Sequence, residues 1–493
     1  MAHLSLRTGR PEMVGLPGRA WVVSFDLRLA PRSRLELGLA PGHDGRSVSL
    51  SAEALPQRVG WRGGGWHHVE LTGSELAIDG RSSRVRAGGG SRLTLRVSRG
   101  RASIEALIVS DAADRGSLLL HRLAELHARI PSGRFPVGAD VADRVHYASA
   151  SDWTSGFWPG ALWEGAGIGP ASGRALFAGW ALAATVGHLG AERTDTHDVG
   201  FMYGESSLAA WRALCRGSSR RTTPTLCARL KQSVLSAADE LLALAASNPG
   251  AGTIPTTDRG PDADTIVDSM MNIAILPWAT RVTGNPAYAR LASHHAHAVA
   301  SLLVRPDGST AQSVHFDRTT GRVLLIHTHQ GLSNSSTWSR GEGWAVYGFA
   351  QAALALHDPG LLGVALRAAD YVARHLPAGG IPLWDYDAPP DGPVDASAGV
   401  ITAAGLLHLA AACRSIPAPC GNSAGRWVAL GRRMLAAALS RASIGPPLGL
   451  LGSQVLNEHA RGCWCDGGEL IFGLTYGVEA ARLAESEAGG SRG

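Results

Sequence analysis

Apolar and polar residues alternate along the first part of the chain. Trp21–Leu29 and Arg92–Val97 follow this alternation, and Gly- and Pro-rich turns separate runs of the same kind up to about Ser110. A period of two places successive side chains on opposite faces of a strand. The pattern therefore predicts a smaller all-β sandwich domain over residues 1–115.

One segment of this region carries a further resemblance. Gly65–Leu71, followed by Leu76–Gly80, resembles the core of laminin-G-like and concanavalin-like sandwiches. Such domains often bind sugars, so the resemblance implies a carbohydrate-binding accessory role. A strand tryptophan more often fills a sandwich core, however, and Trp66 has that packing interpretation as well.

From about Leu118 onward the spacing of apolar residues becomes helical, with apolar positions three and four residues apart. The expected helices are Arg174–His188, Ser206–Cys215, Leu226–Ala246, Thr265–Val282, Tyr288–Leu303, Arg340–His357, Gly363–His375, Ala396–Cys413, Ala424–Ser440 and Leu470–Glu485. Gly- and Pro-rich loops with Trp, His and Asp lie between them. We expect an all-α main domain over residues 116–493, with paired helices closing into a barrel whose loops converge on a site. A solenoid is the competing arrangement, but no repeat of fixed period supports it.

Composition and charge narrow the possible partners. Hydrophobic residues make up 45% of the chain and charged residues 18%, which is typical of a globular protein. The formal charge is +5, but the cations are scattered and nearly all arginine, with Lys231 the only lysine. This distribution favours no nucleic-acid partner and leaves an anionic small substrate open. The chain has no run of about eighteen apolar residues, so we expect no membrane partner. The sequence gives no indication of the oligomeric state.

The cysteines and the start of the chain bear on location. None of the six cysteines has the spacing of a structural zinc knuckle, and we interpret them as free thiols: Cys215, Cys227, Cys413, Cys420, Cys463 and Cys465. Residues 1–20 hold no apolar segment of a signal peptide. Both observations predict a cytoplasmic enzyme, with export as the alternative.

Several loops carry residues suited to sugar chemistry. Trp153, Phe157, Trp158 and Trp163 crowd one Gly/Pro-rich stretch. Aromatic faces stack on the apolar faces of sugar rings, so this stretch is a candidate sugar platform. The same aromatics also have a simpler interpretation, in which they pin a loop to the core.

Two aspartates stand at the start of predicted helical segments, Asp198 after His197 and Asp268 after Val267. Each is either a helix N-cap or a desolvated catalytic acid. Further on, His327 and His329 are too few for a zinc site without a placed carboxylate, so we expect no metal. Arg340 lies between Trp338 and Trp344 and is a candidate anchor for a substrate carboxylate or sulfate. Its alternative role is to shield an aromatic face.

Residues from about Leu120 to Leu483 resemble the unsaturated glucuronyl hydrolases, glycoside hydrolase family 88. The resemblance rests on short motifs that run in the family's order. They are Asp152–Gly160, His197–Phe201, Ile266–Asn272, His329–Gly331, Ser336–Gly341, and Leu383–Asp387 followed by Asp395–Ala398.

The resemblance implies a six-fold α/α-barrel, no cofactor, and an anionic oligosaccharide as substrate. It implies that Asp268 is the catalytic acid/base and that Asp198 is the second essential aspartate. The substrate-binding residues it implies are Trp153, Phe157, His197, His315, His329, Gln330, Trp338, Arg340 and Trp344. The chain departs from the family at Thr253–Asp258, which lacks a usual tryptophan, and at Gly473–Tyr476, which lacks an acid.

The implied reaction releases a terminal 4,5-unsaturated uronic acid by hydration of its double bond. One protonated carboxylic acid donates to carbon and later helps to deprotonate water. Two alternatives stay open. The first is another hydrolase on the same barrel, either a rhamnogalacturonyl hydrolase or a conventional exo-glycosidase using both aspartates. The second is a carbohydrate-binding protein without catalysis.

Overall fold

The structure is a computed structural model of the full chain. It describes the strands between residues 4 and 111, and then residues 115–131, 133–168, 171–216, 223–441, 451–455 and 467–489. The chain divides into two compact units. One comprises Met1–Ser132, Gly165–Trp180 and Leu439–Leu450, and the other comprises Gly133–Glu164, Ala181–Ala438 and Leu451–Gly493.

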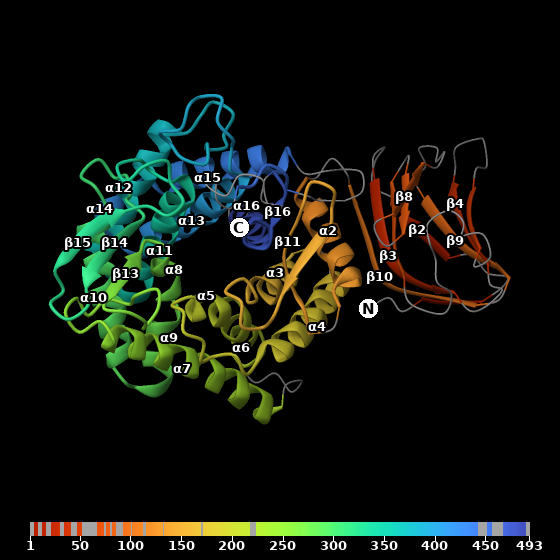
Figure 1. The fold of residues 1–493 in the computed structure, drawn as a ribbon. Helices are drawn as coiled ribbons and strands as arrows, with labels where there is room; N and C mark the ends of the chain where they lie inside the picture. Colours follow the sequence, from red (N-terminus) through yellow and green to blue (C-terminus); the bar gives the residue numbers. More distant parts are fainter. Residues whose placement is uncertain are drawn as a thin grey trace. The chain divides into compact units, whose positions relative to one another are not determined.

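The first unit contains two antiparallel sheets, drawn in red and orange in Figure 1. The six-stranded sheet has the order β1-β10-β3-β6-β7-β8, and the four-stranded sheet has the order β2-β9-β4-β5. The strand bounds are β1 Leu4–Arg7, β2 Glu12–Gly15, β3 Trp21–Leu29, β4 Arg34–Ala40, β5 Ser47–Ser51, β6 His67–Thr72, β7 Glu75–Ile78, β8 Arg81–Arg84, β9 Arg92–Arg99 and β10 Arg101–Asp111.

These strands bear out the period-two pattern. Trp21–Leu29 forms β3 over its full length, and Arg92–Val97 lies within β9. Val69 of β6 is fully buried, as an inward-facing strand residue should be. Trp66, the residue proposed to bind sugar or to fill the core, lies outside the described residues. Helix α2, Arg115–Arg129, follows β10 and contacts both β10 and β3.

Helices make up most of the second unit, coloured yellow to blue in Figure 1. They are α3 Phe157–Gly165, α4 Ala171–His188, α5 Val199–Tyr203, the π-helical η1 Gly204–Leu208, α6 Ala209–Leu214, α7 Pro224–Ala246, α8 Ser269–Asn272, α9 Ile275–Thr283, α10 Ala287–Leu303, α11 Ser339–Leu356, α12 Pro359–His375, α13 Ala396–Ser415, α14 Pro417–Cys420, α15 Ala424–Leu439 and α16 Ile471–Gly489. Part of α4 belongs to the first unit.

Local sequence explains where the long helices start. The side chain of Asp358 accepts hydrogen bonds from the amides of Gly360 and Leu361, and Pro359 occupies the first turn of α12. Asp395 accepts from the amide of Ser397 at the start of α13. A side-chain acceptor before the helix satisfies an amide that has no intrahelical partner. These caps define the residues at which α12 and α13 begin.

Helix α13 corrects the prediction that no segment is apolar enough to span a membrane. Ala396–Ser415 is 20 residues long and contains an 18-residue stretch with a mean hydropathy of 1.6, and 89% of that stretch is buried inside the protein. Its neighbours include α11 and α16. Ser397, Thr402 and His408 interrupt the apolar run, so the sequence shows no unbroken stretch of about eighteen apolar residues here. The burial identifies α13 as a core helix of the helical unit.

The predicted helix over Thr265–Val282 is wrong in its first half. Strand β13, Asp262–Ile266, precedes α8, and Ile273 and Ala274 separate α8 from α9. β13 pairs antiparallel with β14, Ser313–Asp317, and β14 pairs with β15, Val323–His327. Another small sheet joins β12 Val145–Ala148, β11 Phe135–Ala139 and β16 Glu469–Leu470. Pairing with distant segments overrides local propensity in both places.

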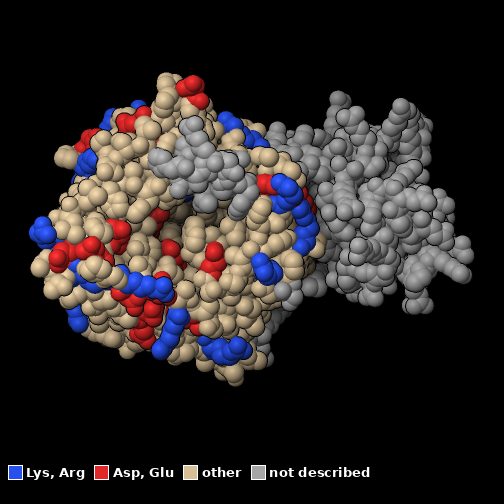
Figure 2. Space-filling view, viewed as in Figure 1, with Lys and Arg blue, Asp and Glu red and all other residues tan. Residues whose placement is uncertain are grey.

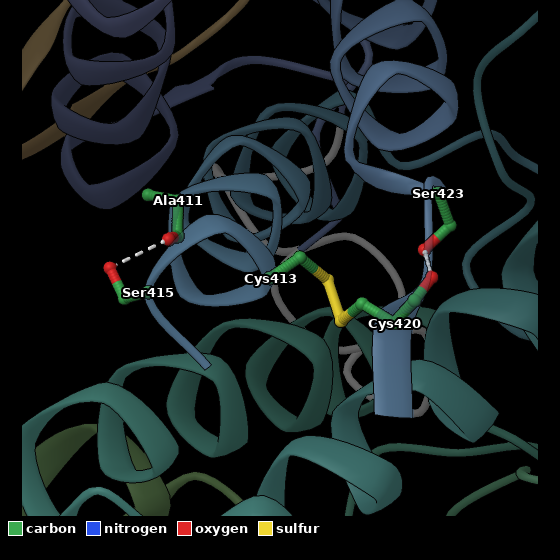
Figure 3. Close-up of a disulfide and its surroundings, with 5 residues drawn as sticks. All are labelled: Ala411, Cys413, Ser415, Cys420 and Ser423. Carbon is green, nitrogen blue, oxygen red and sulfur yellow. Dashed lines mark hydrogen bonds between the residues drawn. A yellow bond between two sulfur atoms is a disulfide. The ribbon is translucent and has the colours of Figure 1, made fainter. Parts of the chain in front are cut away.

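Four cysteines correct the free-thiol interpretation. Cys215 pairs with Cys227, and Cys413 pairs with Cys420 across a Cα–Cα distance of 5.4 Å. The second disulfide joins the last part of α13 to α14 (Figure 3). In each pair the two cysteines belong to segments at or next to different helices, and cysteine spacing alone does not reveal such pairing. Cys463 and Cys465 lie outside the described residues, and the cytoplasmic location stays a prediction.

Candidate active site

Asp198 and Asp268 each stand directly before a short helix, at the ends of connecting segments. Asp198 precedes α5, and Asp268 follows β13 and precedes α8. Neither side chain caps its own helix, so the capping interpretation of both residues is wrong. Helices α5 and α8 pack against each other. The two carboxylates are therefore held near one another by a rigid pair of helix starts.

The environment of Asp268 favours its protonated form. Burial raises the pKa of Asp268 to about 7, and the negative charge of Asp198 adds to the rise. The positive charge of Arg340 and a hydrogen bond from Trp344 oppose it. The Oδ2 atom of Asp268 is enclosed and has no hydrogen-bond partner. An acid with such a pKa is substantially protonated in neutral solution and can also release its proton.

Asn272 connects the two aspartates and their helices. Its Nδ2 lies 3.3 Å from Asp198 Oδ1 and 3.3 Å from His197 Nδ1. Its Oδ1 accepts the amide of Phe201 at 2.7 Å. His197 itself is buried, with Nε2 3.4 Å from Asp198 Oδ1. The amide side chain thus fixes the orientation of Asp198 relative to α8.

Most of the predicted sugar-stacking aromatics form a buried cluster. Phe157 is fully buried, with its ring centroid 5.4 Å from that of Phe201 and 6.0 Å from that of Phe472. Trp344 is also buried and lies 5.2 Å from Phe201. Trp153 keeps a partly exposed ring against this cluster. Trp344 of this cluster hydrogen-bonds to Asp268, so the apolar cluster adjoins the buried acid.

The structure places Arg340 in the interior. Its side chain is 3% exposed, and Nη1 donates to Asp395 Oδ2 at 2.8 Å and to Ser397 Oγ at 3.3 Å. The guanidinium carbon lies 4.6 Å from the ring centroid of buried Trp338. This arrangement supports the shielding interpretation of Arg340. The positive charge of Arg340 acts to lower the pKa of Asp268.

His315 and His329 are brought together around a carboxylate that sequence reasoning missed. Asp264 Oδ1 lies 2.9 Å from His315 Nδ1 and 3.0 Å from His327 Nε2, while His329 Nε2 lies 3.8 Å from Asp264 Oδ2. Burial alone would raise the pKa of Asp264, but hydrogen bonds from His327 and His315 outweigh it and lower that pKa. A placed carboxylate therefore does accompany His327 and His329.

Gln312 organises the loop that carries His329 and Gln330. Its Oε1 accepts from the amides of His329 and Gln330 at 2.7 and 3.0 Å and from Thr328 Oγ1 at 2.6 Å. Its Nε2 donates to Gln330 Oε1 at 2.9 Å. Gln312 also accepts the amide of Val267 through its backbone, immediately before Asp268. One residue thus couples the His329–Gln330 loop to the segment that presents Asp268.

A separate cavity of about 670 Å³ lies in the helical unit, and neither aspartate lines it. Its lining includes Glu164, Glu205, Tyr347 and Glu479. Burial, with the charges of Glu479 and Glu164, raises the pKa of Glu205 to about 8.

In Figure 2 the face of this unit is hollowed near its centre, with Asp and Glu side chains in and around the hollow.

Asn272, Asp264, His327 and Gln312 were not predicted as site residues. Asn272 had the clearest signal, since it lies four residues after Asp268 within the same motif, Ile266–Asn272. Asp264 lies four residues before Asp268, on the strand that leads to it. The contacts of Gln312 depend on tertiary pairing and left no signal in the sequence.

Curated relatives identify the family. The chain is 33% identical over 293 residues to the unsaturated glucuronyl hydrolase of Bacillus sp. (strain GL1), covering 56% of this chain and 72% of that protein. It is 31% identical over 292 residues to the unsaturated glucuronyl hydrolase of Formosa agariphila, covering 56% and 69%. No family model matches the sequence.

Solved structures with a similar fold belong to the same family as these relatives. An unsaturated glucuronyl hydrolase specific for heparin superposes with a TM-score of 0.66 at 25% identity, covering 76% of this chain and 98% of that one. The crystal structure of the Bacillus sp. GL1 enzyme gives 0.63 at 28% identity, covering 76% and 96%. The helix-rich fold, the paired aspartates and these relatives lead to one conclusion: the chain belongs to the unsaturated glucuronyl hydrolase family of glycoside hydrolases.

Proposed function

We propose that this protein releases a terminal 4,5-unsaturated uronic acid from a short anionic oligosaccharide. The observation that carries the proposal is Asp268, an enclosed carboxylic acid whose pKa is raised to about 7. Hydration of a carbon–carbon double bond needs one acid that is protonated in neutral solution and becomes a base after donating. Relatives named unsaturated glucuronyl hydrolase support the same reaction.

The reaction begins at the double bond. The ring oxygen of the unsaturated sugar is attached to C5, so the C4=C5 bond is an enol ether. Asp268 donates its proton to C4, which leaves an oxocarbenium-like cation shared by C5 and the ring oxygen. Asp268, now a carboxylate, accepts a proton from the water that adds to C5. The resulting hemiketal opens, and the glycosidic bond to the next sugar then breaks.

In our proposal, Asp198 and its neighbours support the action of Asp268 as the acid. The charge of Asp198 helps to keep Asp268 protonated, and Asn272 and His197 fix the orientation of Asp198. The partly exposed residues Trp153, His315, His329 and Gln330 contact the sugar. The buried side chains of Phe157, Trp338, Arg340 and Trp344 act by positioning and desolvation.

The finer architecture is also a proposal. The long helices of the second unit, with chemistry in the connections between them, support a six-fold α/α-barrel for the proposed catalytic domain, residues 116–493. The two antiparallel sheets of the first unit support a β-sandwich over residues 1–115. The identity of the sugar adjoining the uronate is not part of the proposal.

Asp198→Asn should shift the alkaline limb of the pH–rate profile to lower pH. Asp268 acts in its protonated form, so wild-type activity falls as the pH rises through about 7. Removing the negative charge of Asp198 removes one cause of the raised pKa, and Asp268 then ionises at lower pH. The measurement is kcat/KM between pH 5 and pH 9. A limb that stays in place, or moves to higher pH, would contradict electrostatic coupling of the two acids.

A pair of synthetic substrates tests the proposed reaction. If C4 is protonated, a disaccharide with a saturated glucuronate in the same linkage should bind without being cleaved. A thioglycoside of the unsaturated uronate should be cleaved, because its leaving atom needs no protonation to start the reaction. Turnover of the unsaturated substrate is measured by the loss of its double-bond absorbance. Cleavage of either substrate is measured by the aglycone that is released.

The rival functions give different results with the same substrates. Acid-assisted cleavage at the anomeric carbon predicts turnover of the saturated sugar and resistance of the thioglycoside. That result would replace the proposal with a conventional exo-glycosidase. Binding without turnover of any unsaturated substrate would indicate a carbohydrate-binding protein.

A further inference from the structure

The sheet of β13, β14 and β15 carries a group of histidines and aspartates on one face. The strand register pairs Asp264 with His315 and Ser313 with His327. Residues two apart on a strand share a face, so Asp262, Asp264, Ser313, His315 and His327 face the same side. Ser313 lies between Asp264 and His327 in this arrangement, and its small side chain leaves the space that they enter.

The loop after β15 adds another imidazole to the group. His329 follows two residues after His327, and the two ring centroids lie 4.5 Å apart. One ligand atom each from Asp264, His327 and His329 lies within 4.8 Å of the others. We propose that these three residues form a binding site for a divalent transition metal ion, with Zn²⁺ the best match to the donors.

The donor set selects the class of ion. Two imidazole nitrogens and one carboxylate oxygen suit zinc and its neighbours, whereas Ca²⁺ and Mg²⁺ prefer oxygen donors throughout. Bonds of about 2.1 Å in a tetrahedron require ligand atoms roughly 3.4 Å apart, so the side chains need to move by little more than about 1 Å. His329 has the freedom to do so, because its side chain is 49% exposed.

Residues behind the ligands already hold the carboxylate in place. His315 Nδ1 and Ser313 Oγ lie 2.9 and 3.2 Å from Asp264 Oδ1. His315 Nε2 faces Asp262 Oδ2 at 3.4 Å. Such outer contacts orient a metal ligand and tune its affinity. Three protein ligands leave a coordination position for water on the side where His329 is exposed. A bound ion would also tie the His329–Gln330 loop to the sheet.

Zinc uptake by the full-length protein tests the site. The chelator-stripped protein is titrated with ZnCl₂ by calorimetry, and bound metal is counted by mass spectrometry after dialysis. We expect one equivalent of zinc whose affinity falls at least about 10–100-fold in His327→Ala, the range seen even for the loss of outer contacts. His297→Ala is the matched control, since His297 also pairs with an aspartate, Asp358 at 2.9 Å, and is not one of the proposed ligands.

Two further results decide the outcome. His329→Ala should weaken zinc binding as His327→Ala does, and its exposed side chain can be removed without disturbing the fold. A wild-type protein that binds no stoichiometric zinc would overturn the proposal. So would zinc binding that survives both substitutions, because the ion would then be bound elsewhere in the chain.

Discussion

Asp268→Asn should abolish turnover of unsaturated disaccharides while leaving the fold intact. Asparagine matches the shape of the protonated acid but cannot donate that proton to carbon or accept one from water. General acid–base catalysis contributes roughly 10²–10⁴-fold to rate, and the loss should be at least that large. The measurement is kcat from the loss of double-bond absorbance, with circular dichroism to verify folding.

Asp239→Asn is the matched control for this substitution. Asp239 is an exposed residue of α7 that accepts a hydrogen bond from Tyr288 at 2.6 Å, so the same chemical change there should leave kcat unaltered. Near-normal turnover by a folded Asp268→Asn protein would remove Asp268 from the mechanism. It would leave Asp198 as the remaining candidate acid of the pair.

Gly200→Ala should impair catalysis without touching either carboxylate. A Cβ atom at Gly200 would lie 2.2 Å from the carbonyl oxygen and 2.3 Å from the Cα of Asn272, both backbone atoms. Helices α5 and α8 must then move apart, and Asp198 moves away from Asp268. We expect a stability loss of about 1–3 kcal/mol from overpacking and roughly 10²-fold lower kcat/KM from misplacement of about 1 Å.

Gly187→Ala separates this steric effect from a general effect of changing glycine. Gly187 lies in α4, and a Cβ there meets no atom within 4 Å. Alanine should therefore be neutral or stabilise the helix by up to about 1 kcal/mol. Thermal unfolding and kcat/KM are measured for both variants. Equal behaviour of the two would show that α5 and α8 tolerate separation, and the close approach would then have no role in positioning Asp198.

The sequence predicted the elements whose patterns are local. Ala287–Leu303 and Ser339–Leu356 are helices close to their expected bounds, and Trp21–Leu29 is a strand. The positions of Asp198 and Asp268 came from ordered motifs rather than from periodicity. The apolar spacing of Thr265–Val282 was misleading, because β13 acquires its extended form from pairing with β14.

The features that sequence reasoning missed depend on long-range contacts. Asp264 meets His327 only because three strands align in one register, and 62 residues of chain separate the two. The partner of Arg340 is Asp395, on a different helix start, so the charge that looked available for substrate is already engaged. The two disulfides likewise depend on how neighbouring helices pack. Side-chain partners of this kind are set by packing and have no local signature.

Helix α13 has a consequence for how the chain reaches its native state. Its 20 residues are apolar enough for a lipid environment, and they are shielded by α11, made earlier, and by α16, the last described helix. During synthesis, α13 therefore leaves the ribosome before one of its covering partners exists. An incomplete chain ending before Ile471 would expose the apolar surface of α13 to chaperones, membranes or other nascent chains. Burial of α13 is therefore complete only after α16 has been synthesised and has packed against it.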